Sequence, residues 1–383
     1  MQSTFADKTS KYAILEILGE GAFGCVHKAR HRETNEYVAM KKVHMKKTRE
    51  GIPTAILREA AFLTKMNKSA HQNLIKLKEI IIDSSQDDNQ IVVFIFEYIE
   101  YDLDRYLKSH RPLNINIIRS LTEQLLTGVS VLHNNSIFHR DIKPQNILIT
   151  SNGILKIADF GLAREYNYTK LLTSVVVTMW YRAPEVLLQA SYNMAVDIWS
   201  VGCIFAEMAF GKALFPGKTE IDQLKKIICL FGLPDKSDWP DKAKITRESF
   251  TNCNKTSTTL ERLIRFTDKC ASDLLQSLLE FNAKNRCSAK KALQHDFFRK
   301  SDHTMCTVSF DDQSLSTAVD DIFDYKQTYL DTISPCDTNS DYEIQSVRSE
   351  FTDSFDVFHS PPMLLYDDSS PIDVFAWYCP TSP

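Results

Sequence analysis

Three short motifs in the middle of the chain constrain its fold and chemistry more than any other feature. His139-Arg-Asp-Ile-Lys-Pro-Gln-Asn146 comes first, Asp159-Phe-Gly161 begins eighteen residues after Asp141, and Ala183-Pro-Glu185 follows. A single Asp on a loop usually caps a helix or a turn, so none of these motifs is specific alone. Their fixed order favours one shared site over three unrelated turns.

The residue types in these motifs suit phosphoryl transfer. That reaction needs a carboxylate to orient the hydroxyl nucleophile, ligands for Mg²⁺ and cations near the phosphates. Asp141 is the candidate for the first role, and Asn146 and Asp159 are the candidate metal ligands. Lys143 and Lys41 supply the cations. The sequence therefore predicts a phosphotransferase that uses a nucleotide and Mg²⁺.

A glycine-rich stretch, Gly19–Val26, has the pattern G-x-G-x-x-G-x-V. Dinucleotide-binding folds use a similar spacing, but there the glycines lead into a helix, whereas the strand-like Cys25–Arg30 follows here. Glycines let backbone N–H groups approach phosphate oxygens, because no side chain intervenes. An ordinary hairpin turn is the alternative interpretation. As a nucleotide loop, the stretch would consist of Gly19, Glu20, Gly21, Ala22, Phe23 and Gly24.

Lys41 ends the segment Val38-Ala-Met-Lys41, which fits a V-A-I-K strand. A lysine there contacts the α- and β-phosphates and is held by a carboxylate from the neighbouring helix, for which Glu59 is the candidate. A solvated strand lysine is the alternative, since further lysines follow. The basic run 41–49 also resembles a nuclear-localisation patch, but its first half lies in a predicted core strand.

The pattern of apolar residues divides the chain into a β-rich unit and a larger helical unit, an α+β architecture. The predicted strands are Tyr12–Leu18, Cys25–Arg30, Glu36–Val43 and Ile91–Glu97. One helix follows Pro53 and places Ile56, Ala60 and Leu63 on one face. From about residue 113 onward, helices are predicted at Ile115–Asn134, Tyr192–Phe210, Thr219–Phe231 and Ser272–Glu280.

Charge separates the C-terminal region from the rest of the chain. Residues 301–383 contain 16 acidic and two basic residues, whereas the first 300 residues carry a net charge of +10. The acidic region is rich in Asp, Ser, Thr and Pro, so a disordered tail is predicted over 299–383. We find no zinc finger or RNA-binding aromatic motif, so we expect no direct nucleic-acid binding.

No membrane or secretion signal is evident in the sequence. It contains no run of about 18 apolar residues and no apolar segment at the N-terminus. Nine cysteines are scattered without a C-x-x-C pair. We therefore expect a soluble intracellular protein with free thiols and no membrane partner.

Together these motifs, over residues 12–298, resemble a eukaryotic protein kinase. The resemblance implies the bilobal kinase fold: a short extension at 1–11, a β-rich N-lobe with one key helix at about 12–98, and a mainly α-helical C-lobe at about 99–298. ATP would bind between the lobes. Lys143 within H-R-D-x-K-P-x-N is similar to the serine/threonine class.

The same resemblance implies an adenine site. Phe96 matches the gatekeeper, Glu97 and Ile99 would offer backbone contacts to adenine, and Leu18 would flank the base. The apolar residues on its two faces would be Val26, Ala39 and Leu148.

Two segments narrow the resemblance to the cyclin-dependent kinases. Pro53-Thr-Ala-Ile-Leu-Arg-Glu59 is similar to their P-S-T-A-I-R-E helix, which docks cyclin, although four of its positions differ from that consensus. Residues 172–192 and 200–207 resemble the cyclin-D-dependent branch, and Gly232-Leu-Pro234 and Asp238-Trp-Pro240 agree with it. This branch implies a D-type cyclin partner, retinoblastoma-family substrates and a role in G1 progression. It also implies kinase-inhibitor partners and shuttling between nucleus and cytoplasm.

The resemblance extends to regulation and substrate choice. Thr173 matches the threonine that an activating kinase phosphorylates. The basic residues that would receive the phosphate are Arg58, Arg140 and Arg164. Thr178 would bridge Asp141 and Lys143. Arg182 would shape the pocket for a proline after the target Ser/Thr, and Arg286 would pair with Glu185.

Two features of this chain depart from the family pattern. Ala22 and Phe23 stand where relatives often carry phosphorylatable Thr-Tyr, so an inhibitory phosphorylation is predicted to be absent from the glycine loop. The acidic tail contains four Ser-Pro sites, for which we expect phosphorylation, detectable by mass spectrometry of the active complex: Ser334, Ser360, Ser370 and Ser382.

Two other functions compete with a cyclin-dependent kinase. A mitogen-activated type is disfavoured, because residues 159–185 contain no T-x-Y dual phosphosite. A catalytically silent scaffold that sequesters cyclin or kinase inhibitors is disfavoured as well, because Lys41, Asp141 and Asp159 are all present. Competition for cyclin could still accompany an active kinase as a secondary role.

Overall fold

The computed structural model describes residues 9–21, 24–46, 52–69, 71–83, 89–110, 113–160, 164–165, 179–253 and 269–299. The chain divides into two units, Met1–Ile333 and Ser334–Pro383, and every described residue belongs to the first. The predicted tail, 299–383, therefore lies almost wholly outside the described residues.

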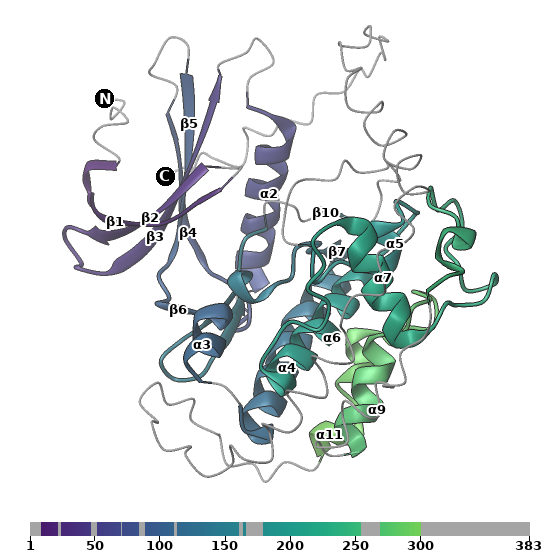
Figure 1. Cartoon of the computed structure of the whole chain (residues 1–383). Helices are drawn as coiled ribbons and strands as arrows, with labels where there is room; N and C mark the ends of the chain where they lie inside the picture. Colours follow the sequence, from purple (N-terminus) through teal and green to yellow (C-terminus); the bar gives the residue numbers. More distant parts are fainter. Residues whose placement is uncertain are drawn as a thin grey trace, which may run out of the picture. The chain divides into compact units, whose positions relative to one another are not determined.

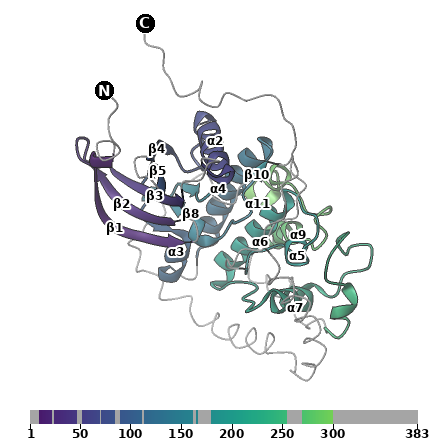
Figure 2. The same cartoon turned by 90° about the horizontal axis from the view of Figure 1, so that it is seen from above.

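The first hundred residues form a five-stranded antiparallel sheet with the order β1-β2-β3-β5-β4 (Figure 1). Its strands are β1 (Tyr12–Gly21), β2 (Gly24–His31), β3 (Tyr37–Lys46), β4 (Leu77–Asp83) and β5 (Asn89–Glu97). The helix predicted after Pro53 is α2 (Thr54–Ser69), which lies beside the sheet in both views (Figures 1 and 2). β4 is the strand that the sequence analysis missed.

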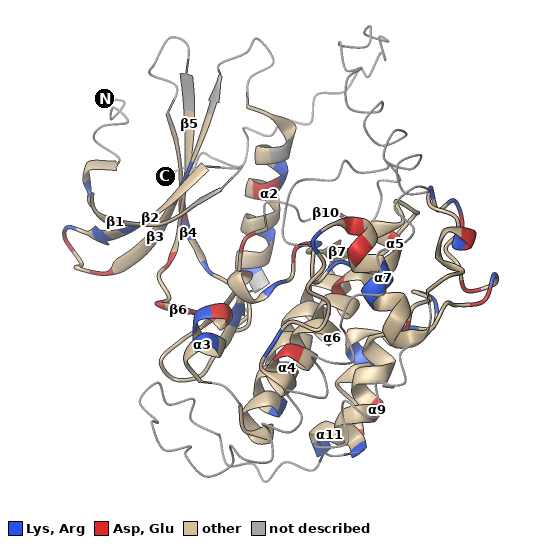
Figure 3. Cartoon of the chain, viewed as in Figure 1, with Lys and Arg blue, Asp and Glu red and all other residues tan. Residues whose placement is uncertain are grey.

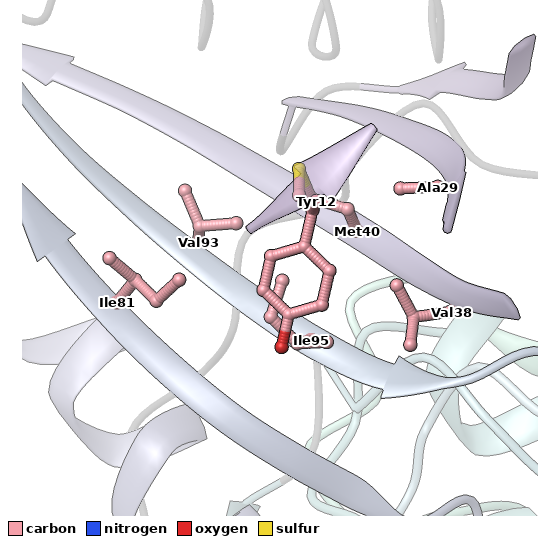
Figure 4. Packing of buried hydrophobic residues seen from close by; sticks show 7 residues of the cluster. All are labelled: Tyr12, Ala29, Val38, Met40, Ile81, Val93 and Ile95. Carbon is pink, nitrogen blue, oxygen red and sulfur yellow. The ribbon is translucent and has the colours of Figure 1, made fainter. Parts of the chain in front are cut away.

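One face of this sheet carries a small hydrophobic core (Figure 4). Val38 and Met40 of β3 and Val93 and Ile95 of β5 are each two residues apart, so they point to the same side. Tyr12 from β1 covers them. Its hydroxyl donates to Glu79 Oε2 of β4 at 2.9 Å, which joins the two edge strands. The core occupies this face and leaves the opposite face of β2, β3 and β5 to carry Lys41 and its neighbours.

The second part of the chain is mainly helical, as predicted. Two small sheets, β6-β8-β9 and β7-β10, lie among its helices. The central helix α6 packs against α4 and α9. Its charged residues are Asp197 and Glu207, and the part of α6 that is visible in Figure 3 is mostly tan. The helices are α3 (Leu103–Ser109), α4 (Ile115–Asn134), α5 (Pro184–Leu187), α6 (Ala195–Phe210), α7 (Glu220–Phe231), α9 (Lys269–Leu278), α10 (Ala289–Ala292) and α11 (Asp296–Arg299). The short strands and 3₁₀ turns are β6 (Tyr101–Asp102), β7 (Ile137–Phe138), η1 (Pro144–Asn146), β8 (Ile147–Ile149), β9 (Leu155–Ile157), β10 (Arg164–Glu165) and η2 (Arg247–Phe250).

Local side chains explain where several helices begin. The side chain of Asn114 caps α4 by accepting from Asn116 N at 2.8 Å, and Thr219 caps α7 by accepting from Asp222 N at 3.1 Å. Thr219 was predicted to be inside the helix, but as the capping residue it has an extended backbone. Such a cap satisfies an N–H group that has no partner within the helix.

Among the residues that the structure describes, no helix combines the length and the apolar character that a membrane crossing requires.

Candidate active site

Lys41, Glu59 and Asp159 come together from three distant parts of the chain. Lys41 Nζ of β3 lies 2.8 Å from Glu59 Oε1 of α2 and 3.1 Å from Asp159 Oδ1. Burial acts to lower the pKa of Lys41, but the two carboxylates outweigh it and raise the pKa. Lys41 is therefore a fixed cation and not a solvated strand lysine.

Asp159 keeps its negative charge in this position. Burial acts to raise its pKa, but the charge of Lys41 and the hydrogen bond from it outweigh burial, so the pKa is lowered. The side chain is nevertheless 45% exposed. Its backbone has a φ of 60°, a left-handed conformation that costs a non-glycine residue free energy and is common at functional sites.

The segment 139–146 arranges its polar side chains around Asp141. Lys143 Nζ lies 2.8 Å from Asp141 Oδ2, and Asn146 Nδ2 donates to the same oxygen at 2.9 Å. Asn146 Nδ2 also donates to the backbone oxygen of Asp141 at 2.8 Å. These contacts hold the Asp141 carboxylate in one orientation, as positioning of a substrate hydroxyl requires.

Asn146 and Asp159 are suitable ligands for Mg²⁺. The backbone N of Ala158 donates to the backbone oxygen of Asn146 at 2.9 Å, which places Asp159 one residue from this contact. Because the Asn146 amide nitrogen is used by Asp141, its side-chain oxygen is the atom left to meet a cation. One carboxylate and one amide oxygen, completed by water and phosphate oxygens, suit a hard cation.

A buried carboxylate that the sequence analysis did not assign to the site, Asp197, anchors the segment that carries Asp141. Asp197 Oδ2 accepts from the backbone N of His139 at 2.8 Å, and Oδ1 accepts from the backbone N of Arg140 at 2.8 Å. His133 Nε2 lies 2.9 Å from Oδ2. Burial acts to raise the pKa of Asp197, but the hydrogen bond and charge of His133 outweigh it and lower the pKa. The available signal was that Asp197 is one of two charged residues in the long, mostly apolar stretch 195–210.

Aromatic contacts join α2 to the same segment. The ring of Phe160 lies 4.9 Å from the ring of Phe62 on α2 and 5.0 Å from the ring of His139. A movement of α2 would therefore disturb both Glu59 and the packing behind Asp159.

Three of the residues predicted to surround adenine, Val26, Ala39 and Phe96, lie on the side of the sheet that carries Lys41. Across the strands, Val26 is opposite Lys41, and Ala39 is opposite Phe96. Leu148 lies in β8, and Leu18 on β1 is 44% exposed.

The segment after β5 presents only part of its backbone to a ligand. Glu97 N donates to Lys76 O at 3.0 Å, so an adenine contact from Glu97 would use its carbonyl oxygen. Its side chain lies 2.8 Å from Lys156 Nζ. The side chain of Glu97 is therefore held by the protein itself.

Part of the glycine loop lies within the described residues. Gly24 has a φ of +127°, and a Cβ there would lie 1.9 Å from the backbone oxygen of Lys42, so only glycine fits this close approach. Gly19 and Gly21 end β1, whereas the side chain of Glu20 and all of Ala22 and Phe23 lie outside the described residues.

The predicted regulatory residues are only partly described. Thr173 and Thr178 lie outside the described residues, as does the side chain of Arg164. The backbone of Arg164 pairs with Phe138, close to Arg140. Arg58 is exposed on α2, and the Arg140 guanidinium lies 5.9 Å from the centre of the Tyr192 ring.

Two further arginines make ion pairs. Arg182 Nη1 lies 3.2 Å from Glu220 Oε1 of α7. The expected pair of Arg286 and Glu185 is present at 2.8 Å and is almost fully buried.

Asp197→Asn is expected to lower kcat about ten- to a hundredfold. The NH₂ group of the asparagine would face the backbone N–H of either His139 or Arg140, so one of these hydrogen bonds would be lost and Asp141 would shift. Peptide phosphorylation at saturating ATP measures this, with Asp296→Asn as a control, because that carboxylate is exposed and pairs with Arg299 on the surface of α11. A wild-type kcat for Asp197→Asn would contradict the anchoring role.

Comparison with known proteins agrees with the resemblance that the motifs showed. A family model described as "Protein kinase domain" matches residues 12–298. Cyclin-dependent kinase 4 of Rattus norvegicus is 42% identical over 299 residues, which cover 77% of this chain and 98% of the relative. Cyclin-dependent kinase 4 of Xenopus laevis is 40% identical over 314 residues, covering 82% and 98%. The protein of the same name from Mus musculus is 42% identical over 298 residues.

Proposed function

The chain belongs to the protein kinase family, as a member similar to cyclin-dependent kinase 4, and from this premise we propose that it acts with a D-type cyclin on retinoblastoma-family proteins to promote G1 progression. ATP-dependent serine/threonine kinase activity and the use of Mg²⁺ follow from membership of the protein kinase family and the similarity to its cyclin-dependent members. Dependence on a cyclin follows from the similarity to cyclin-dependent kinase 4. The predicted bilobal kinase fold is confirmed by the β-sheet lobe and the helical lobe.

One observation carries the kinase activity on which this proposal rests. Lys41 lies 2.8 Å from Glu59 and 3.1 Å from Asp159, although Asp159 is 118 residues away in the sequence. This is the arrangement that phosphate positioning by a kinase requires, because Lys41 can then contact phosphates next to a metal-binding carboxylate.

The side chains divide the work of phosphoryl transfer. Asp141 orients the Ser/Thr hydroxyl of the substrate and accepts its proton, while Lys143 keeps the Asp141 carboxylate in place. Lys41, fixed by Glu59, binds the phosphates of ATP. When bound, Mg²⁺ supplies positive charge that neutralises the phosphate oxygens, and Asn146 and Asp159 would hold it.

Cyclin dependence has a physical basis in this arrangement. Glu59 and Phe62 both lie on α2, so the position of α2 determines whether Lys41 and Phe160 are held. A cyclin that binds only the aligned position of α2 would increase its population. We propose that an activating kinase then phosphorylates Thr173 and that Arg58, Arg140 and Arg164 receive the phosphate through charge-assisted hydrogen bonds.

The cyclin preference is testable by phosphate transfer to a retinoblastoma C-terminal fragment. We expect transfer when the full chain, phosphorylated on Thr173, is combined with a D-type cyclin, and little transfer without cyclin. Activity only with another class of cyclin would overturn the D-type assignment. Inactivity with every cyclin, despite a demonstrated complex, would favour the scaffold alternative.

A further inference from the structure

A cluster of one lysine and two tyrosines lies at the edge of the ATP site. Lys28 Nζ of β2 lies 4.6 Å from the ring centre of Tyr98 and 5.2 Å from that of Tyr37. The two rings are 6.2 Å apart. The Lys28 side chain is 21% exposed and also pairs with Glu16 of β1 at 3.3 Å. Cation–π contacts of this kind hold a lysine in place without a buried carboxylate.

The position of Lys28 in the sheet connects this cluster to the nucleotide. Lys28 is opposite Ala39, and Ala39 is opposite Phe96, so the three side chains share one face of the sheet. Lys28 is two residues from Val26, which also lies on this face. Tyr98 stands between Glu97 and Ile99, the residues expected to meet adenine.

Backbone hydrogen bonds do not join β2 directly to the segment that contains Tyr98, because β3 separates β2 from β5 in the sheet. The Lys28 side chain spans this gap. The pKa of Lys28 is raised, chiefly through a hydrogen bond with the Tyr98 side chain, so the lysine is charged throughout the neutral range.

We propose that the contact between Lys28 and Tyr98, here called the β2–hinge clamp, positions the strand carrying Val26 against the segment Glu97–Ile99 and so sets the affinity for ATP. The proposal rests on the ATP site described above. Without the clamp, the strand carrying Val26 and the segment Glu97–Ile99 are correctly positioned in a smaller fraction of the free protein molecules. The apparent affinity for ATP is the intrinsic affinity multiplied by the fraction of molecules that is correctly arranged, whereas the bound complex still reacts normally.

Steady-state kinetics of the full chain with its activating cyclin test the clamp. We expect Lys28→Met and Tyr98→Leu to raise the KM for ATP about three- to tenfold while kcat changes less than about twofold. Lys28→Arg keeps a cation next to Tyr98, so it should stay within about twofold of the wild-type KM. Lys78→Met is the matched control, because it removes a comparable lysine that pairs with Glu36 on the surface of β4.

Calorimetric titration of the same proteins with ADP separates failure of the clamp from failure of the ATP site. Weaker ADP binding by Lys28→Met and Tyr98→Leu alone is the expected result. Normal ADP binding by the wild type together with unchanged values for both variants would overturn the clamp alone. A wild type that binds no ADP would overturn both the clamp and the proposed function.

Discussion

Replacement of Asp141 by asparagine is expected to reduce kcat by about 10²- to 10⁴-fold. The amide cannot accept the proton of the substrate hydroxyl, and it no longer attracts Lys143, which lies 2.8 Å from the carboxylate. Asp141 forms its ion pair with Lys143, and Lys41 forms its own with Glu59 and Asp159, so the affinity for ATP should change little. Phosphate transfer at saturating ATP, with a parallel titration of ADP, measures both quantities.

Asp296→Asn is a suitable control for this experiment. The Asp296 carboxylate is 67% exposed and pairs with Arg299 at 3.0 Å, on the helix α11. The Asp296→Asn substitution makes the same chemical change on the surface of the helical lobe. Retention of more than about a tenth of the wild-type kcat by Asp141→Asn would contradict the role assigned to Asp141.

Loss of Arg286 is expected to destabilise the fold by about 3–5 kcal/mol, because Arg286→Met leaves the Glu185 carboxylate buried without its cation. The Glu185 side chain is only 3% exposed. Arg286 also donates to the backbone oxygens of Ala195 and Glu280, so further acceptors lose a donor. Urea unfolding of the full chain, followed by tryptophan fluorescence, gives the change in the free energy of unfolding.

A double-mutant cycle isolates the charge from the packing. In a Glu185→Gln background, Arg286→Met should cost clearly less than in the wild type, since no unpaired charge is left behind. Arg299→Met removes an exposed ion pair and should change the free energy of unfolding by less than about 1 kcal/mol. Equal costs of Arg286→Met in both backgrounds would show that the ion pair itself is not the source of the effect.

Short-range patterns allowed much of the fold to be predicted. α4 has the limits expected from its apolar periodicity, and the predicted strands Cys25–Arg30 and Ile91–Glu97 lie within β2 and β5. β4 was missed although Leu77–Asp83 is rich in isoleucine, and α6 begins at Ala195, three residues later than predicted. Such limits depend on capping and on the neighbouring strand, which periodicity does not record.

The sequence by itself determined which chemistry the chain carries. Motifs such as 139–146 are local, so the spacing of Asp141, Lys143 and Asn146 already brings their side chains together around one turn. The V-A-I-K pattern extended this information to Glu59 as the partner of Lys41, and the family resemblance extended it to Arg286 as the partner of Glu185. Both pairs are found in the structure.

Only the tertiary structure decided how these groups are supported. Asp197 carries a carboxylate in an apolar helix, and its partners His139 and Arg140 are 58 and 57 residues away. Lys28 and Tyr98 are likewise separated by most of the β-sheet lobe. Residue types and local spacing specify what a side chain can do, but the free energy of burying or pairing it depends on contacts between distant segments, which form only when the whole chain packs.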